Sequence, residues 1–181
     1  MSEGYLYVAT GSRYIEEAIR SAKSLKLYNP SAKIALVSTA EIKEAVFNQV
    51  IVLKHTEASD WKGGFSFKVN GLLNSPFEKT FFVDTDTYFT ADTSELFDLL
   101  NYKDLLICHS PNDISRVKIG EKKLEGYTPY NTGVIVFKQN ERIASLFRTW
   151  KRLYQNKTST YLSDQPAFME ALLQQDIKNL T

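Results

Sequence analysis

The chain has little cysteine, no excess of charge of either sign and no long apolar run, and each shortage excludes a class of protein. Cys108 is the single cysteine among 181 residues, which excludes an intrachain disulfide and a zinc site built from cysteines. No segment approaches the roughly 18 consecutive apolar residues that a membrane-spanning helix requires. The short apolar stretch at 4–9 lacks a charged leader, so we expect no signal peptide. We therefore expect a cytoplasmic protein without a transmembrane segment.

The charges nearly balance, with 22 basic and 21 acidic residues and a formal net charge of +1. No local basic stretch with interleaved aromatic residues compensates for this balance, so nucleic acid is not an expected partner. Apolar residues make up 43% of the chain and aromatic residues 13%, which is typical of a globular fold and not of a disordered chain. The length suits one domain with a sizeable core.

Short apolar runs alternate with stretches of helical spacing along most of the chain. The expected strands cover residues 5–10, 34–37, 50–53, 80–84, 105–108 and 134–137. The expected helices cover residues 14–27, 41–48, 65–74, 94–100, 140–154 and 163–174. Loops are expected at 57–64 and at 111–126. This alternation predicts an α/β fold, with a mostly parallel mixed sheet and helices on both of its faces.

Two aspartates, Asp84 and Asp86, stand at the end of the apolar run that begins at Phe81. A strand alternates faces with a period of two, so we expect both side chains to point the same way. Two neighbouring like charges repel each other, and burial strengthens the repulsion. A hard divalent cation with oxygen ligands would relieve it, and such an ion commonly shares its coordination with substrate phosphates. The pattern therefore points to a metal site for a phosphorylated ligand.

The acidic motif alone leaves three interpretations open. It fits the DxD motif of metal-dependent glycosyltransferases, the DxDxT motif of haloacid-dehalogenase-like phosphatases, and two aspartates in an ordinary surface turn. The phosphatase interpretation is weakened by position, because that family's nucleophile normally lies on the first strand whereas Asp84 lies near the middle of the chain. It also requires a later acidic pair, and after Asp104 only isolated aspartates occur.

Three further features stand in a suggestive order around the acidic motif. Asn131 and Gly133 precede an apolar strand, where they offer amide groups and a close backbone approach, although both are also common in turns. Asp164 and Gln165 stand at an expected helix start, where capping alone would explain them. Lys68 lies on the helix before the acidic strand and would offset the charge of a diphosphate, although a lone helical lysine is usually just solvated.

Taken together, these motifs resemble the metal-dependent nucleotide-sugar glycosyltransferases with an A-type, Rossmann-like fold, close to the glycogenin and galactosyltransferase-like group. The resemblance spans Lys68 to Gln165 and implies the Rossmann-like nucleotide-diphospho-sugar transferase fold. It implies a single catalytic domain over residues 1–181, which transfers a hexose from a nucleotide-diphosphate sugar, UDP-linked by expectation, to an unidentified acceptor.

The same resemblance implies a role for each motif. Mn²⁺ or Mg²⁺ would bind Asp84 and Asp86. The donor would contact Thr10, Gly11, Lys68, Asp84 and Gly133. The residues assigned to catalysis around the sugar are Asn131, Asp164 and Gln165.

One departure from the family pattern concerns the third metal ligand. Relatives commonly supply a histidine after the helix that begins with the Asp-Gln pair, whereas His55 and His109, the only histidines here, both come earlier. We expect either water or phosphate in that place or a chain that lacks a C-terminal segment. A non-catalytic nucleotide-sugar or glycan binding module therefore remains the alternative function.

Overall fold

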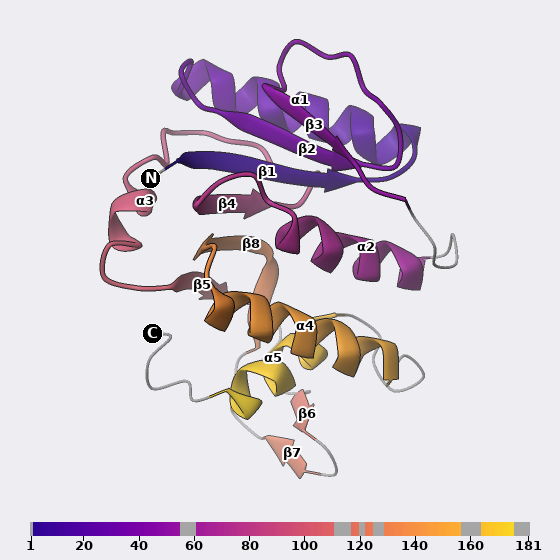
Figure 1. Cartoon of the computed structure of the whole chain (residues 1–181). Coiled ribbons are helices and arrows are strands. Elements are labelled where there is room, and N and C mark those ends of the chain that lie inside the picture. The colour runs from indigo at the N-terminus through magenta and orange to yellow at the C-terminus, as the bar shows by residue number, and fades with distance from the viewer. Residues whose placement is uncertain are drawn as a thin grey trace.

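The computed structural model describes residues 2–54, 61–110, 117–119, 122–124, 129–156 and 164–175 (Figure 1). The strands are β1 Glu3–Ala9, β2 Ile34–Ser38, β3 Gln49–Val52, β4 Lys79–Val83, β5 Leu105–His109, β6 Val117–Ile119, β7 Lys122–Leu124 and β8 Tyr130–Lys138. The helices are α1 Ser12–Tyr28, α2 Trp61–Leu73, α3 Leu96–Leu99, α4 Glu141–Asn156 and α5 Gln165–Gln174.

Six strands form the central sheet in the order β3-β2-β1-β4-β8-β5, while β6 and β7 pair separately. The pairings of β1 with β2, of β1 with β4 and of β2 with β3 are all parallel. In contrast, β8 runs antiparallel to both of its neighbours, β4 and β5. The predicted α/β class and mostly parallel mixed sheet are confirmed.

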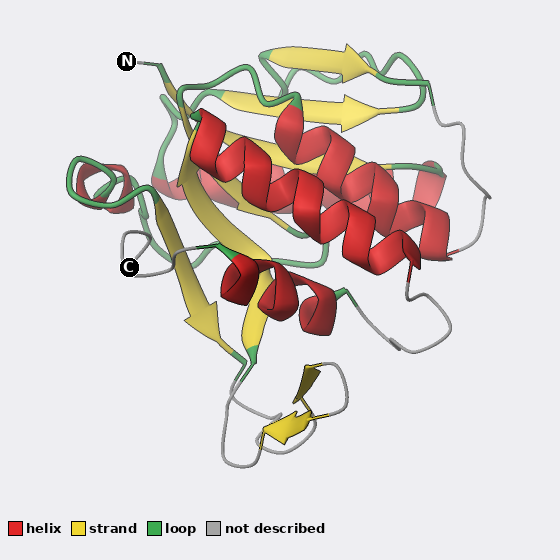
Figure 2. Cartoon of the chain, turned by 60° about the horizontal axis from the view of Figure 1, so that its bottom comes forward, coloured by secondary structure: helices red, strands yellow, loops and turns green. Residues whose placement is uncertain are grey.

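Helices cover both faces of this sheet. In Figures 1 and 2, α1 lies on one face, and α2, α4 and α5 form a layer on the other. Each layer has its own group of buried apolar residues, one centred on the aromatic strand residues Tyr5 and Phe81, the other on Trp150 of α4 and Phe168 of α5. Within the described ranges, no helix is both long enough and apolar enough to cross a membrane.

The amphipathic helix α4 begins where the sequence predicts. Asn140 accepts a hydrogen bond of 3.0 Å from the backbone N–H of Ile143 through its side-chain oxygen. This contact satisfies one of the unpaired N–H groups of the first turn. The buried face of α4 then runs from Ile143 to Tyr154, as its apolar spacing indicates.

Three local predictions are wrong. The segment expected as a loop at 111–126 contains the antiparallel strands β6 and β7. The segment expected as a helix at 41–48 is irregular, with one short turn at 45–46, because Asn48 pairs with Ile34 through both its backbone and its side chain, each at 2.8 Å, while Phe47 packs into the core. Pairing with the end of a neighbouring strand outweighs a weak helical pattern. The helix expected to begin at Phe65 begins at Trp61, so Gly63 and Gly64, expected in a loop, are helical.

Candidate functional site

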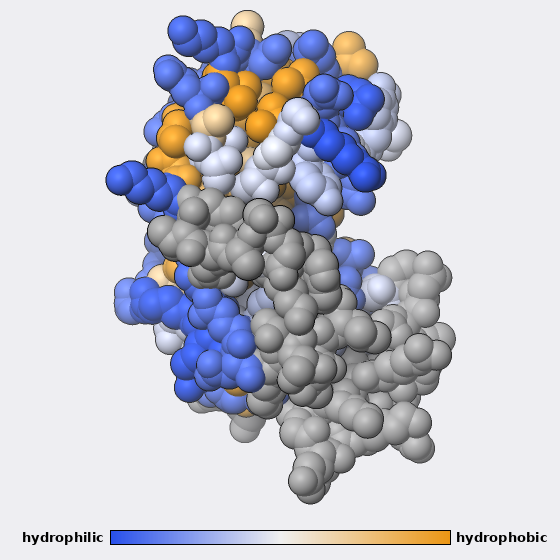
Figure 3. All heavy atoms as spheres, turned by 90° about the vertical axis from the view of Figure 1, so that its right-hand side faces the viewer, coloured by the Kyte–Doolittle hydropathy of each residue, from blue (hydrophilic) through white to orange (hydrophobic). Residues whose placement is uncertain are grey.

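A pocket of about 750 Å³ opens at the carboxyl ends of β1 and β4. In parallel α/β sheets this edge is the usual place for ligands. Figure 3 faces the side of the molecule on which β1 and β2 end, where a group of apolar residues is bordered by hydrophilic ones. The lining residues are Val8, Ala9, Thr10, Gly11, Arg13, Tyr14, Glu17, Thr39, Gly64, Phe65, Phe67, Lys68, Asp84, Thr85 and Asp86.

A tight turn at Gly11 connects β1 to α1 beside the pocket. Gly11 has φ of 80° and ψ of 153°, a backbone conformation that strongly favours glycine because it has no Cβ. Its carbonyl accepts a hydrogen bond of 3.2 Å from the N–H of Ile15, which starts the helix. Thr10 and Gly11, both predicted to contact the donor, thus line the pocket.

The two predicted metal ligands lie in a turn and not on a strand. β4 ends at Val83, and both the N–H and the hydroxyl of Thr87 donate to the carbonyl of Asp84, at 3.3 and 2.8 Å. The prediction that Asp84 and Asp86 point the same way was based on strand alternation, and this basis is wrong. Asp84 and Asp86 nevertheless line the same pocket, Asp84 partly buried and Asp86 exposed. We call residues 84–86 the acidic turn.

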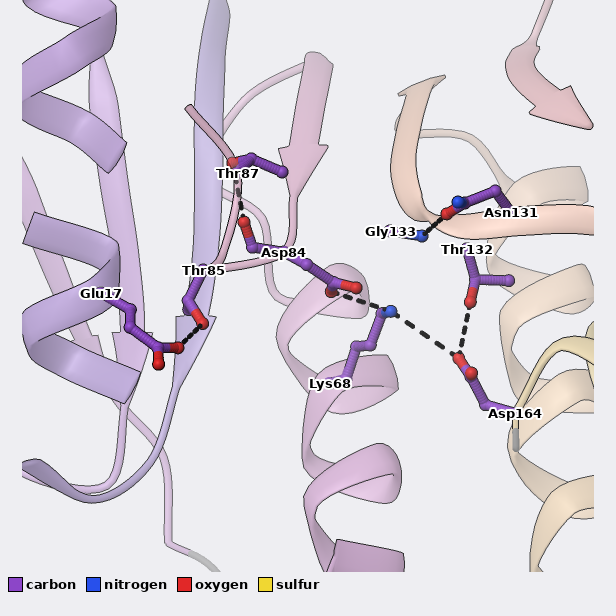
Figure 4. Close-up of polar contacts among 9 residues, drawn as sticks. All are labelled: Glu17, Lys68, Asp84, Thr85, Thr87, Asn131, Thr132, Gly133 and Asp164. Atoms are coloured by element: carbon purple, nitrogen blue, oxygen red, sulfur yellow. Dashed lines mark hydrogen bonds and ion pairs between the residues drawn. The ribbon is translucent and has the colours of Figure 1, made fainter. Parts of the chain in front are cut away.

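Lys68 projects from α2 between two carboxylates that come from different segments (Figure 4). Its Nζ lies 3.0 Å from Asp84 Oδ1 and 3.7 Å from Asp164 Oδ2. The lysine side chain is only 11% exposed, and Nζ lies 5.1 Å from the centre of the Phe82 ring. A buried ammonium needs such partners to offset its loss of hydration. Lys68 therefore has two carboxylate partners, and Asp86, which also lines the pocket, adds a further negative charge there.

Close packing of α2 on β1 holds Lys68 in this position. Gly71, one turn after Lys68, lies so near Val8 that a Cβ on it would come within 2.4 Å of Val8 Cγ2. A glycine is therefore required for the backbone of α2 to approach the sheet this closely. The short approach brings the lysine stem over Phe82 and its ammonium to the end of β4.

The electrostatic environment changes the acidity of Asp84. Burial among protein atoms raises the pKa of its carboxyl, Lys68 opposes this effect, and the carboxylates of Asp164 and Asp86 add to it. Part of the side chain, 41%, remains accessible from the pocket. A cation entering the pocket would therefore find a carboxylate that is incompletely neutralised by Lys68.

The start of β8 lies directly against Asp84. The N–H of Asp84 donates a 2.7 Å hydrogen bond to the carbonyl of Gly133, and the N–H of Gly133 donates one of 2.7 Å to Asn131 Oδ1. A Cβ at Gly133 would lie 2.9 Å from Asn131 Oδ1 and 3.0 Å from Asp84 Oδ2. The group that lies close to the Gly133 backbone is thus the Asp84 carboxylate and not a ligand, while the amide NH₂ of Asn131 has no hydrogen-bond partner among the described residues.

Asp164 is buried and points at Lys68 instead of capping its helix. Its carboxylate accepts a hydrogen bond of 2.9 Å from Thr132 Oγ1, and no side-chain capping contact to α5 is formed. The indole N–H of Trp150 donates to the Asp164 carbonyl at 3.0 Å, which fixes the backbone. Gln165 begins α5 beside it, half-buried and outside the pocket lining. The side chain of Asp164 therefore does not cap α5 but forms an ion pair with Lys68.

The structure brings most of the predicted site residues together, and in the part of the chain that it describes the acidic turn offers two carboxylates to a metal. Among the described residues, no group of three acidic, histidine or cysteine side chains is placed to hold an ion. His109 is exposed and stacks on Tyr130, with ring centres 4.5 Å apart, while His55 lies outside the described residues. Two carboxylates and open space suit a hard divalent cation that takes its remaining ligands from phosphate and water.

Sequence reasoning missed four residues that organise this site. Thr132 and Trp150 hold Asp164, while Glu17 and Thr85 are hydrogen-bonded to each other beside the acidic turn. For Glu17 a signal existed, because it stands four residues before Ser21, so that both side chains lie on one face of α1. Thr132 lies between Asn131 and Gly133, which were both assigned roles, but was itself assigned none.

The sequence model described as nucleotide-diphospho-sugar transferase matches residues 79–180, more than half of the chain. No curated protein matches the chain in sequence.

Solved glycosyltransferases share the fold. The galactosyltransferase LgtC in complex with donor and acceptor sugar analogs is 15% identical, with a TM-score of 0.69 over 93% of this chain and 70% of LgtC. An active-site mutant of LgtC gives 14% identity and a TM-score of 0.66, covering 93% of this chain and 69% of that one. The glycosyltransferase GlyE of Streptococcus pneumoniae TIGR4 is 16% identical, with a TM-score of 0.65 over 94% of this chain and 43% of GlyE.

Proposed function

Because the chain belongs to the nucleotide-diphospho-sugar transferase family, we propose that it is a metal-dependent glycosyltransferase. It moves a hexose from a nucleotide-diphosphate sugar, UDP-linked by our proposal, to an acceptor. The single observation that carries this proposal is the meeting of Lys68, Asp84 and Asp164, from three separate segments, beside the pocket at the end of β1 and β4.

The pocket divides into a nucleoside side and a phosphate side. Thr10 and Gly11 border the half formed by the end of β1 and the start of α1, where the nucleoside would bind. Lys68 and the acidic turn border the other half, where the diphosphate would bind. The mixture of apolar walls and a few charged groups fits a ligand with both a base and phosphates.

The acidic turn fits a divalent cation. Asp84 and Asp86 would hold Mn²⁺ or Mg²⁺. The Lys68 ammonium, 3.0 Å from Asp84, supports this assignment because it shows that the Asp84 carboxylate already binds a cationic group. When bound, such an ion supplies Lewis-acid stabilisation of the leaving diphosphate. Once a metal occupies Asp84, the Lys68 ammonium would keep Asp164 as its remaining carboxylate partner. It would then be able to place a second positive charge near the same phosphates.

The sugar would lie on the side of the pocket bordered by β8 and α5. Asn131 would offer its amide NH₂ to sugar hydroxyls, and Gly133 lets the start of β8 lie close against the acidic turn. Asp164 and Gln165 stand at the start of α5, next to Lys68. The group of four residues would orient the donor sugar while its bond to the diphosphate breaks.

A turnover assay tests the proposal directly. The purified chain is incubated with UDP-hexoses, and UDP release is followed with Mn²⁺, with Mg²⁺ and with EDTA. We expect release that requires the metal, whether water or an added glycan accepts the sugar. Metal-dependent UDP binding without any release would favour a binding module, and release of phosphate from simple esters would favour the phosphatase. A single catalytic domain over residues 1–181 and a cytoplasmic location belong to the same proposal.

A Lys68→Ala variant tests the division of the pocket. We expect weaker binding of UDP than in the wild type, but binding of uridine that is little changed, because the lysine faces the phosphate side alone. Equal losses for the nucleotide and the nucleoside would contradict this arrangement. Lys23→Ala, which removes an exposed lysine on α1, is the control.

A further inference from the structure

Helix α1 carries three polar side chains on the side that faces the protein. Glu17, Ser21 and Ser24 are spaced by four and three residues, so they lie along one face of the helix. Ser21 is 1% exposed and Ser24 is 2% exposed. Buried hydroxyl groups are costly unless they are hydrogen-bonded, so their partners show what this face holds.

Each of these side chains holds one residue of the segment that follows β4. Thr85 Oγ1 donates to Glu17 Oε2 at 3.0 Å, Ser21 Oγ pairs with Thr87 Oγ1 at 2.9 Å, and Ser24 Oγ accepts from the Phe89 N–H at 2.9 Å. The three held residues alternate along the chain. We call Glu17, Ser21 and Ser24 the polar stripe of α1.

The stripe reaches the backbone of Asp84. Because the Thr87 hydroxyl donates its hydrogen to the Asp84 carbonyl, it must accept from Ser21. Ser21 in turn accepts from the Tyr7 hydroxyl of β1, at 2.9 Å. A continuous chain of hydroxyl groups therefore links β1, α1 and the acidic turn.

Glu17 has both of its carboxylate oxygens engaged. Oε2 accepts from Thr85, and Oε1 accepts from Arg13 Nε at 3.1 Å. Although Glu17 lines the pocket, its oxygens are directed to these partners. Its place in the site is therefore that of a support, and not that of a third metal ligand.

We propose that the polar stripe of α1, acting chiefly through the contact between Glu17 and Thr85, sets the metal affinity of the acidic turn. Thr85 stands between the two aspartates, and in Figure 4 its side chain points to Glu17 whereas Asp84 points to Lys68. Fixing Thr85 towards α1 leaves the flanking carboxylates directed into the pocket. Glu17 and Thr85 are thus positioning residues, and this inference rests on the proposed function of the acidic turn.

The test compares Thr85→Val with Thr85→Ser. Valine keeps the branched shape but cannot donate to Glu17, whereas serine keeps the donor. Mn²⁺ alone is the first probe, with free ion measured by electron paramagnetic resonance; UDP binding is then measured by calorimetry with Mn²⁺ and with EDTA. Thr90→Val, an exposed position on the same segment, is the control.

We expect Thr85→Val to bind Mn²⁺ about tenfold more weakly than the wild type, as the loss of a hydrogen bond to a charged group would allow. Thr85→Ser and the control should stay within about twofold of the wild type, and UDP binding in EDTA should be unchanged in all of them. A purely structural role would lower the metal-free binding as well. Glu17→Gln, which keeps an acceptor for Thr85, should retain more affinity than Glu17→Leu.

Two results would overturn this inference and leave the proposed function standing. One is wild-type Mn²⁺ affinity in Thr85→Val, and the other is an equal loss in Thr85→Ser, since the hydroxyl would then not matter. If the wild type itself shows no Mn²⁺-dependent binding of UDP, the proposed function fails and this inference fails with it. Should Thr85→Val not fold, the comparison of Glu17→Gln with Glu17→Leu decides in the same way.

Discussion

The backbone of Gly133 is packed against the carboxylate of Asp84, so that a Cβ at position 133 would lie 3.0 Å from Asp84 Oδ2. The same two residues share a 2.7 Å hydrogen bond, from the N–H of Asp84 to the carbonyl of Gly133. The glycine is needed here for space alone, because its φ is not positive. The position of the acidic turn therefore depends on the smallest side chain at the start of β8.

Gly133→Ala should displace the Asp84 carboxylate. We expect metal-dependent UDP affinity to fall about tenfold while the free energy of unfolding drops by only about 1 kcal/mol, because the atoms in the way are ends of side chains that can move. Calorimetry and chemical denaturation measure the two quantities. Gly64→Ala is the stability control, since no heavy atom of the described part of the chain lies within 4 Å of its added Cβ. Unchanged affinity in Gly133→Ala would contradict the close packing.

Lys68→Met should leave Asp84 and Asp164 facing each other without a cation between them. We expect the variant to lose about 2 kcal/mol of unfolding free energy at neutral pH, less than for a fully buried pair because Asp84 is partly accessible. The loss should shrink as the pH is lowered, because protonated carboxyls no longer repel. Denaturation curves across the pH range measure this, and Lys23→Met is the matched control. A loss that does not depend on pH would point to packing instead of charge.

Asp84→Asn should stabilise the protein at neutral pH while it abolishes metal binding. Burial raises the pKa of Asp84 in the folded state. The folded state then binds this proton more tightly than the unfolded state, so wild-type stability falls as the pH rises from the ordinary value of 3.8 through the raised one. Asparagine lacks this cost. The difference in melting temperature between the variant and the wild type should therefore be positive at pH 7 and vanish in acid. A constant difference would contradict the shift.

Asp86→Asn should remove metal-dependent nucleotide binding and leave the fold intact, since Asp86 is exposed. We expect UDP affinity in Mn²⁺ to fall to the level measured in EDTA, with a melting temperature within the range of ordinary surface substitutions. Asp98→Asn, an exposed aspartate on α3, controls for the change of charge. Undiminished UDP affinity in Mn²⁺ would remove Asp86 from the proposed metal site.

The elements could be predicted where the local pattern agrees with the tertiary contacts. The apolar strands and the α4 cap at Asn140 were found because each is encoded within a few residues. The segment at 41–48 was missed because Asn48 pairs with a strand far along the sequence. In general, a single sequence indicates periodicity but not which distant backbone groups will meet.

The site could be predicted as a set of residues but not as a set of contacts. Asp84 and Asp164 lie in one cluster around Lys68, but not for the reasons that the sequence suggested, because Asp84 lies in a turn and Asp164 does not cap its helix. The partner of Glu17 was beyond reach, since nothing in the sequence links α1 to residue 85. Such pairings depend on how the helix rotates when it packs on the sheet.

β8 runs antiparallel to its neighbours, and this direction decides which of its residues reach the rim of the pocket, that is, the edge of the sheet at the carboxyl ends of β1 and β4. Strands that run with their neighbours contribute only their trailing loops to this rim. A strand of nine residues spans roughly 30 Å, so in the parallel orientation Asn131 and Gly133 would emerge on the far side of the molecule. By running backwards, β8 delivers its leading residues to the acidic turn. Under the proposed function, substitutions at the start of β8 can thus change the side of the pocket assigned to the sugar without disturbing β1 and β4, which border the side assigned to the nucleotide.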